Sequence, residues 1–391
     1  MQRLTRIIAL GYIAICLIAL AGRALVGPLG YAPLPLIAGP ARAPVVVTIW
    51  YGSEKQAWLE EAQRRFTASQ PTTGGRPIQV QLKSLGSREM VERVASQDWR
   101  GETPPTALSP ASAFWLDLAS VPVARSGGDA PRTLALSPLV VIGWQDRAKA
   151  LWPSGPRDFW RDLHDAIANP GGWKALGGSA SWGLVKLGHT SPLKSNSGAQ
   201  ALMMMAYGFY GKSAGLSAAD IANPEFAQWL REIESGVASF GDSSAALMTD
   251  IVNKGASQYD FAIVYENLAI ESMDAARSRQ GQPLQVFYPP AAMLSDHPFA
   301  TLEGAWVKPE ERAAAGQFRD FLLSRPIQEL ALRYGFRPVD QGVAVTSPDP
   351  ANPFNKYAAN GVQVALAGQG DPPPADATRA LLELWRMKIG R

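Results

Sequence analysis

The chain has a single cysteine, Cys16, among its 391 residues. Disulfide bonds and cysteine-ligated zinc sites are therefore excluded from everything that follows it. Cys16 lies within an apolar run at residues 7–26, and Ile15, rather than a small residue, precedes it directly. That is not the pattern of a lipidated cysteine, so we interpret Cys16 as an apolar residue of this run.

The chain also lacks a large excess of charge of one sign, because its formal net charge is only +3. No block of Lys and Arg residues alternates with aromatic residues, which argues against a nucleic-acid partner. The chain is 47% hydrophobic and 18% charged, as in an ordinary globular protein.

Catalytic and metal-binding motifs are missing as well. The chain has three histidines and no H-E-x-x-H, G-x-S-x-G, G-x-G-x-x-G or G-x-x-x-x-G-K-[ST] sequence. For His164 and His297, the sequence identifies no partner. We therefore predict a protein that is not an enzyme and that has neither a metal site nor a cofactor.

The N-terminal region has the pattern of an export signal. Arg3 and Arg6 precede the apolar run, as in a secretory signal peptide, and the run approaches the ~20 residues that span a bilayer. Residues 1–26 are predicted to be a signal peptide or a membrane anchor, and the Pro- and Gly-rich residues 27–44 a tether. The protein is then expected at the periplasmic or extracellular face, secreted or held in the cytoplasmic membrane by residues 7–26.

From residue 45 the chain alternates between strands and helices. "VVVTIWY" (45–51) is typical of a strand buried on both faces, and strands are also expected at 78–82, 106–108, 136–144, 182–188, 259–267 and 284–290. Helices are expected after residue 53, where Ser53 and Gln56 have capping-box spacing, and after Ser109-Pro110. Further helices are expected at 87–97, 197–211, 223–235, 243–255, 310–338 and 376–389. The order predicts an α/β protein, and its length exceeds the ~250–300 residues that one core serves, so two lobes are expected.

Serine residues occur where helices are expected to begin after strands. In open α/β sheets ligands bind outside the carboxyl ends of the strands, where helix N-termini present N–H groups. Each serine alone is an ordinary N-cap, but several together fit a small oxyanion or another acceptor-rich ligand held by neutral dipoles. These serines are Ser53, Ser109, Ser112, Ser195, Ser197 and Ser243.

Other polar residues extend this candidate site. His189, Thr190 and Asn196 lie in the loop "GHTSPLKSNSG" (188–198), where His189 contacts the ligand or makes a structural hydrogen bond to the loop. Tyr265 and Glu266 end the strand at 259–267. The Glu266 carboxylate repels an anion, so it indicates a cationic or hydroxyl-bearing ligand, or it pairs with a nearby base.

The motifs resemble those of bacterial extracellular solute-binding proteins of the type II periplasmic class, especially the molybdate-like and von Willebrand A-associated branches. The matching segments include "ALSPASAFW", "LGHTSPLKSNSG", "YDFAIVYENLAIES" and "HPFATLEGAWV", followed by the ending "GFRP". The resemblance runs from about Val45 to Asn355. It implies the receptor of an ABC importer, with a small polar solute as ligand and an ABC permease or a von Willebrand A-type protein as partner.

The resemblance also implies a fold. Two α/β lobes would be joined by two crossing hinge strands near "ALSPLVV" and "QVFYPP". Lobe one would comprise 45–137 and 286–346, lobe two 138–285, and 347–391 a C-terminal tail and helix. Ser53, Ser109 and Ser112 would face Ser195, Asn196, Ser197 and Tyr265 across a cleft. Two alternatives remain: a membrane-tethered sensor or assembly partner that uses the fold without transport, and an enzyme on this scaffold.

Overall fold

A computed structural model describes residues 11–15, 42–124, 127–128 and 130–390, which belong to two units, Met1–Ala43 and Pro44–Arg391. Residues 11–15 are helical and exposed. Among the described residues, no helix combines the length and apolar character needed to cross a membrane. Most of the predicted signal or anchor (1–26) and of the tether (27–44) lies outside these residues, so both remain predictions.

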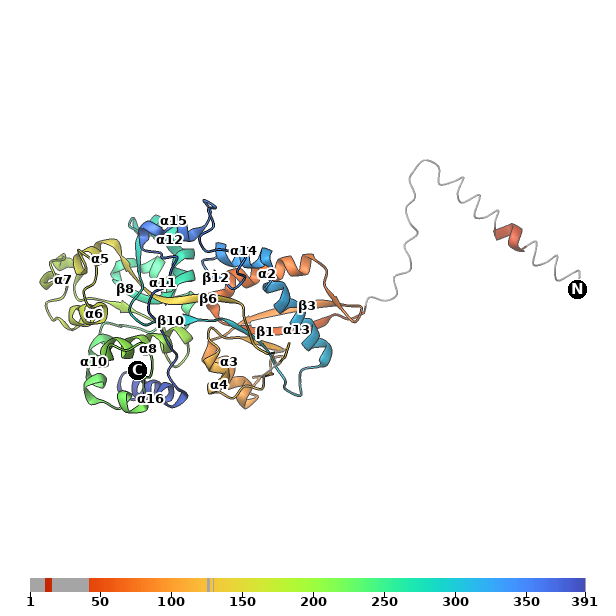
Figure 1. Ribbon diagram of the computed structural model, residues 1–391, viewed down its shortest axis with the longest axis horizontal. Helices are drawn as coiled ribbons and strands as arrows, with labels where there is room; N and C mark the ends of the chain where they lie inside the picture. Colours follow the sequence, from red (N-terminus) through yellow and green to blue (C-terminus); the bar gives the residue numbers. More distant parts are fainter. Residues whose placement is uncertain (1–10, 16–41, 125–126, 129, 391) are drawn as a thin grey trace, which may run out of the picture. The chain divides into compact units, whose positions relative to one another are not determined.

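The first sheet of the second unit has the strand order β2-β3-β1-β4-β11-β5. Strand β1 (Val45–Tyr51) pairs in parallel with β3 (Arg76–Ser84) and β4 (Ala107–Ser109), as its continuous apolar sequence predicts. Strands β2 (Thr72–Thr73), β5 (Arg132–Thr133) and β11 (Pro298–Thr301) pair antiparallel at the edges. We call this sheet and its helices lobe one. Those helices are α2 (Gln56–Ala68), α3 (Ser87–Ser96), α4 (Phe114–Leu118), α13 (Pro309–Leu322) and α14 (Arg325–Arg333) (Figure 1).

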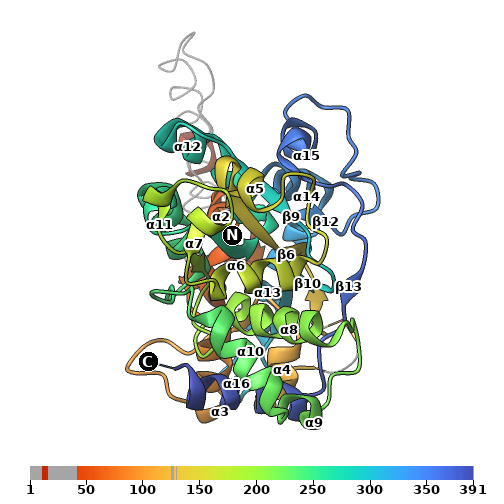
Figure 2. The ribbon, with the colours of Figure 1, turned by 90° about the vertical axis from the view of Figure 1, so that its left-hand side faces the viewer.

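The second sheet is built on β6 (Ala135–Trp144), which pairs with β8 (Phe261–Tyr265), β9 (Leu284–Phe287), β10 (Ala292–Ser295) and β12 (Arg337–Pro338). Strands β7 (Leu187–Gly188) and β13 (Gln369–Gly370) extend it. We call this sheet and its helices lobe two. Those helices are α5 (Gln145–Leu151), α6 (Phe159–Ala168), α7 (Gly172–Ala175), α8 (Asn196–Tyr210), α9 (Ala218–Ile221), α10 (Pro224–Glu234), α11 (Ser244–Lys254), α12 (Glu266–Gln280), α15 (Pro353–Lys356) and α16 (Ala375–Lys388) (Figure 2).

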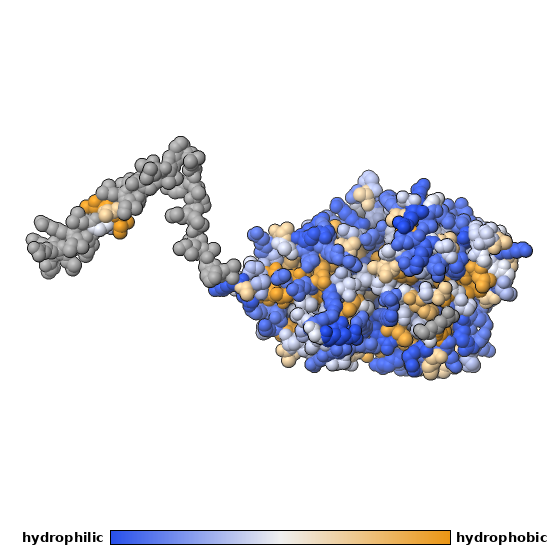
Figure 3. Space-filling view, turned by 180° about the vertical axis from the view of Figure 1, so that it is seen from behind, coloured by the Kyte–Doolittle hydropathy of each residue, from blue (hydrophilic) through white to orange (hydrophobic). Residues whose placement is uncertain are grey.

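Helix α8 is the central helix of lobe two. Its sequence is mostly apolar after Gln200, and each residue from Asn196 to Tyr207 is buried, as expected of a helix inside a core. Helices α6, α10 and α16 pack around it (Figure 2). The outer face shown in Figure 3 is mostly hydrophilic, with hydrophobic residues in separate small patches.

The two sheets confirm the predicted two-lobe fold with crossing strands, and the chain crosses between them three times, because β12, after α14, pairs with β6 of the second sheet. The chain leaves the first sheet through β5 and enters the second through β6, at the predicted "ALSPLVV". The return was predicted too early, at "QVFYPP". Residues of that segment form β9, which pairs with β6 inside the second sheet, and the chain returns only between β10 and β11. The predicted lobe boundaries themselves remain a prediction.

Several local predictions were wrong. Ser53 does not form a capping box, because residues 53–55 form a 3-10 turn that buries Glu54 and Lys55, and α2 begins only at Gln56 without a side-chain cap. Pro110 does not open a helix, since α4 begins at Phe114. The strand expected at 182–188 is reduced to β7, and a 3-10 turn at Ala180–Trp182 precedes it. Two other short 3-10 turns occur at Gly255–Ser257 and Ala358–Asn360.

Candidate functional site

Four hydroxyl groups contact one another where helices α8 and α11 begin. The Thr190 hydroxyl lies 2.7 Å from that of Ser197, which lies 2.8 Å from that of Ser244. The Ser195 hydroxyl is 3.1 Å from that of Ser197 and 3.4 Å from that of Ser244. All four residues are buried. We call Thr190, Ser195, Ser197 and Ser244 the hydroxyl cluster.

The N-cap residues of two helices and a close approach at Gly198 position the hydroxyl cluster. Ser195 is the N-cap residue of α8 and Ser243 that of α11, so both helices direct the positive ends of their dipoles to this region. Gly198 allows α8 to approach the preceding loop, since a Cβ atom there would meet the Thr190 carbonyl oxygen at 2.3 Å. Ser243 itself caps α11 by accepting a hydrogen bond from the Ala246 N–H.

Lobe one reaches the same region through Ser53. The Ala245 N–H, in the first turn of α11, donates to the Ser53 hydroxyl at 3.4 Å. Ser53 belongs to lobe one and α11 to lobe two, so this contact spans the two lobes. The structure therefore brings together Ser53, Thr190, Ser195, Ser197 and Ser243, with Ser244, the neighbour of Ser243, as a further member.

Asn196 connects the lobes through its side-chain amide. Its oxygen accepts from the Trp115 indole N–H at 2.8 Å, and its nitrogen donates to the Tyr265 hydroxyl at 2.8 Å and the Ser295 hydroxyl at 3.3 Å. Burial raises the pKa of Tyr265 well above its ordinary value, so the phenol remains protonated.

Ser112 takes part in a second contact across the lobes. Its hydroxyl accepts from the Gln200 side-chain amide at 3.1 Å, and the Ser295 hydroxyl donates to the Gln200 oxygen at 2.9 Å. Ser109 differs from these residues: its hydroxyl is buried and has no hydrogen-bond partner among the described residues.

A buried charged group that the site prediction missed lies in lobe one, next to Ser53. The Lys55 ammonium contacts the Glu54 carboxylate at 2.5 Å and lies 3.3 Å from His297 Nδ1. Burial alone would raise the pKa of Glu54, but Lys55 and His297 outweigh it and lower this pKa to about 2. Burial and the Lys55 charge lower the pKa of His297 to about 4, so the imidazole is neutral near pH 7.

The backbone at His297 adopts a conformation that few side chains tolerate. Its φ is +36°, and its Nε2 atom is buried without a partner among the described residues. The adjacent Asp296 carboxylate accepts from the Ala113 N–H at 2.9 Å, and burial raises its pKa. The position of Glu54 and Lys55, directly after strand β1, was the sequence signal that could have identified them.

His189 does not point into the hydroxyl cluster but supports it. Its Nδ1 lies 2.9 Å from the Thr190 carbonyl oxygen and its Nε2 lies 3.0 Å from the Glu234 carboxylate. Both partners are acceptors, so both ring nitrogens donate and the ring is an imidazolium. Burial opposes this charge, but Glu234 outweighs it and raises the pKa of His189. The structure thus gives His189 the structural hydrogen bond that the sequence left as one of two options.

Glu266 pairs with a base, Arg337 of the "GFRP" segment. Arg337 Nη2 and Nε each lie 2.7 Å from a different oxygen of the Glu266 carboxylate, and the Tyr288 hydroxyl donates to the same group. Burial raises the pKa of Glu266 against the opposing effect of Arg337. Glu266 is therefore engaged within lobe two. In the described part of the chain, no group of three or more His, Cys, Asp or Glu residues is arranged to hold a metal ion.

Comparison with known proteins identifies the class. Residues 47–337 match the family described as "Bacterial extracellular solute-binding protein", and the chain belongs to this family. Membership of an extracellular family suggests a periplasmic location. The family is one of solute-binding proteins, and similar solved structures are described as binding proteins too.

Proteins with a similar sequence are only distantly related to this chain. An uncharacterized protein of Mycobacterium tuberculosis, from strains CDC 1551 and H37Rv, is 25% identical over 312 residues. That match covers 77% of this chain, and the chain spans only 42% of the length of these relatives.

Solved structures share the fold at low identity. The sulfate-binding protein SubI of Mycobacterium tuberculosis H37Rv is similar with a TM-score of 0.52 and 20% identity, covering 86% of this chain and 96% of that one. The maltose-bound MalE3 of T. maritima is similar with a TM-score of 0.61 and 14% identity, covering 88% and 95%. AfuA of Actinobacillus pleuropneumoniae, with fructose-6-phosphate bound, has a TM-score of 0.58 and 13% identity, covering 89% and 99%.

Proposed function

We propose that the protein is an extracytoplasmic receptor that captures a small oxyanion between its two lobes and delivers it to an ABC importer. The observation that carries the proposal is the hydroxyl cluster at the converging N-termini of α8 and α11, with Ser53 reaching it from lobe one. Hydroxyl and backbone N–H groups donate to an anion without a full countercharge. A ligand that contacts both lobes would stabilise their closed arrangement.

The charged side chains near the hydroxyl cluster are paired with one another, which leaves hydroxyl and N–H dipoles to hold a ligand. Lys55 is paired with Glu54, and His189 with Glu234, so neither cation is left uncompensated. Glu266, whose charge would repel an anion, is neutralised by Arg337. The solved sulfate-binding protein with this fold gives sulfate as the first oxyanion to test.

The test uses residues 44–391, which form one compact unit. Melting is measured with sulfate, molybdate and phosphate, and with amines, sugars and metal ions for comparison. At 100 times its dissociation constant, a ligand specific to the folded state adds about 2.7 kcal/mol to the free energy of unfolding. Sulfate or a related oxyanion should raise the melting temperature by several degrees.

A matched pair of variants links this shift to the site. Ser197→Ala should abolish the oxyanion shift, whereas Ser181→Ala, at an exposed serine of lobe two, should keep it. A shift that survives Ser197→Ala would place the ligand elsewhere. A shift produced by amines or sugars, but by none of the oxyanions, would overturn the proposed ligand class.

A second function is favoured by the contacts between the lobes. Hydrogen bonds from Trp115 to Asn196 and from Asn267 to the Glu54 carbonyl oxygen join the lobes directly. Lobes joined by their own side chains fit a sensor or assembly partner, including one that binds a von Willebrand A-type protein. X-ray scattering that gives the same compact form with and without every solute tested would favour it over the receptor.

We also propose that residues 7–26 tether the receptor to the cytoplasmic membrane. The support is the apolar run after Arg3 and Arg6. Fractionation of cells that express the full chain tests this: a tethered protein sediments with membranes, and a cleaved one appears in the soluble periplasmic fraction.

A further inference from the structure

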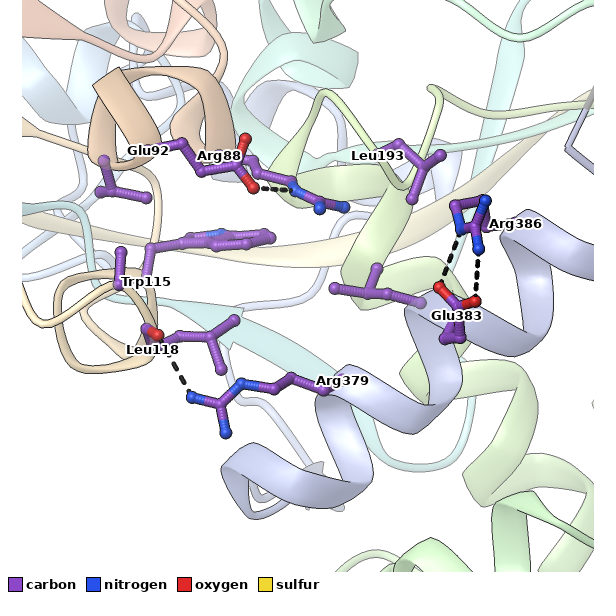
Figure 4. Close-up of a pocket in the computed structure, with 11 residues that line it drawn as sticks. Arg88, Glu92, Trp115, Leu118, Leu193, Arg379, Glu383 and Arg386 are labelled. Atoms are coloured by element: carbon purple, nitrogen blue, oxygen red, sulfur yellow. Dashed lines mark hydrogen bonds and ion pairs between the residues drawn. The ribbon is translucent and has the colours of Figure 1, made fainter. Parts of the chain in front are cut away.

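A pocket of about 470 Å³ lies between α3 and α4 of lobe one and the C-terminal helix α16 of lobe two. Its volume falls within the range of ~300–1,000 Å³ typical of small-molecule sites. Figure 4 shows Trp115 projecting into it from α4, with Leu118 below and Leu193 opposite (Figure 4). The pocket is separate from the hydroxyl cluster, because none of the four hydroxyl residues lines it.

Two arginines border the apolar part of this pocket. Arg88 comes from α3 and lies above the Trp115 ring, and Arg379 comes from α16 and lies below it (Figure 4). Arg379 donates a hydrogen bond of 3.3 Å to the Leu118 carbonyl oxygen. Arg88 bonds Glu92 through Nε at 2.6 Å, and its Nη1 has no partner among the described residues.

The carboxylates of the pocket are already occupied. Glu383 forms two short hydrogen bonds with Arg386, of 2.6 and 2.8 Å, and Glu92 is the partner of Arg88 Nε. Three arginines and two glutamates leave one surplus positive charge, next to an apolar surface that includes an indole ring. Guanidinium groups bind carboxylates in planar, charge-assisted geometry, and aromatic rings stack on one another and on guanidinium planes.

We propose that this pocket binds a small ligand that joins a carboxylate to an aromatic body. The aromatic body lies against Trp115, and the carboxylate is held by the guanidinium group of Arg379 (Figure 4). Because Trp115 and Arg379 belong to different lobes, such a ligand contacts both lobes and stabilises their closed arrangement. The site is thus a second one, beyond the oxyanion site proposed above, and it does not depend on that site.

The test is a calorimetric titration of the full chain with indole-3-propionate in sulfate-free buffer. Indole-3-propionamide, which lacks the charge, and acetate, which lacks the ring, serve as comparison ligands. We expect indole-3-propionate to bind at least about tenfold more tightly than either, since loss of a charge-assisted contact weakens binding by that order. No binding of indole-3-propionate at millimolar concentration, or equal binding of its amide, would overturn the proposal.

Variants locate the binding. Arg379→Gln should weaken the binding of indole-3-propionate about tenfold, whereas Arg64→Gln, at an exposed arginine of α2, should leave the affinity unchanged. Ala119→Phe places a ring inside the pocket from lobe one without removing a charge, and it should abolish binding. Unchanged affinity in Ala119→Phe would overturn the assignment, even if an arginine variant fails to fold. A failure of sulfate to bind the protein would not affect this titration.

Discussion

Glu234 joins His189 to the C-terminal helix. One carboxylate oxygen lies 3.0 Å from His189 Nε2, and the other accepts from the Trp385 indole N–H of α16, also at 3.0 Å. His189 in turn donates to the carbonyl of Thr190, a member of the hydroxyl cluster. The last helix of the chain is therefore connected to the candidate oxyanion site by three side chains in sequence.

This connection predicts a pH-dependent stability. The pKa of His189 is raised in the folded protein, so its contribution is complete below pH ~6.5 and is lost as the pH rises through the folded pKa. Glu234 is the charged group that faces the ring. His189→Gln should remove this part of the pH dependence and destabilise the protein at pH 6 by about 3–5 kcal/mol, because a buried pair is broken.

Urea unfolding of the parent, His189→Gln and His164→Gln between pH 5 and pH 9 measures this effect. His164 is nearer the surface and contacts two partly exposed carboxylates, so its variant should change stability by no more than about 1 kcal/mol. Parallel pH profiles for the parent and His189→Gln would show that the imidazole does not carry this charge.

His297 should have the opposite dependence. Its pKa is lowered to about 4 by burial and by Lys55, so its contribution is complete above pH ~6.5 and is lost as the pH falls toward 4. The charged groups around it are Glu54, Lys55 and the neighbouring Asp296. In the parent, the free energy of unfolding should decrease between pH 6.5 and pH 4, and His297→Gln should reduce this decrease by an amount on the order of 3 kcal/mol. Acid titration followed by tryptophan fluorescence measures it, and an unaltered acid limb in the variant would contradict it.

Removal of Arg337 should strongly destabilise lobe two. Arg337→Gln leaves the Glu266 carboxylate buried without its bidentate partner, at a cost of about 3–5 kcal/mol in the free energy of unfolding. Arg333→Gln, at an exposed arginine of α14, is the matched control and should change it by less than about 0.5 kcal/mol. Equal effects of the two substitutions in chemical unfolding would contradict the structural role assigned to Glu266.

Gly198→Ala should damage the hydroxyl cluster. The added Cβ would meet the Thr190 carbonyl oxygen at 2.3 Å and the Pro192 nitrogen at 2.7 Å, so α8 or the loop has to move. Oxyanion binding should fall by at least about tenfold, a loss of about 1.4 kcal/mol. Gly128→Ala, where the added atom would meet nothing within 4 Å, should bind like the parent. Calorimetry with sulfate compares the two, and unchanged affinity in Gly198→Ala would count against this site.

Much of the fold could be predicted from the sequence, because its strongest signals are local. Strand β1 was expected from a continuous apolar run, and helix α16 from apolar residues at helical spacing. Strand β7 was predicted too long, because only Leu187 and Gly188 find a partner strand and pairing is decided by distant residues. The return to the first sheet was placed too early for the same reason: β9 pairs with β6.

The candidate site was predictable in part. Serines after strands indicated Ser195 and Ser197, since helix N-termini gather at one edge of a sheet. The group formed by Glu54, Lys55 and His297 was not found. The position of Glu54 and Lys55 after strand β1 could have indicated these two, but nothing in the sequence links them to His297, 242 positions after Lys55. The role of Glu266 depended likewise on Arg337, 71 positions away.

The hydroxyl groups of Thr190, Ser195, Ser197 and Ser244 contact one another so that either member of each pair could be the donor. The direction of this small ring of bonds is therefore set by hydrogen positions alone, and hydroxyl hydrogens rotate at little energetic cost. A bound ligand can therefore reverse the direction of these hydrogen bonds while the heavier atoms stay in place. Ligand binding would then change the positions of the hydroxyl hydrogens before either lobe moves.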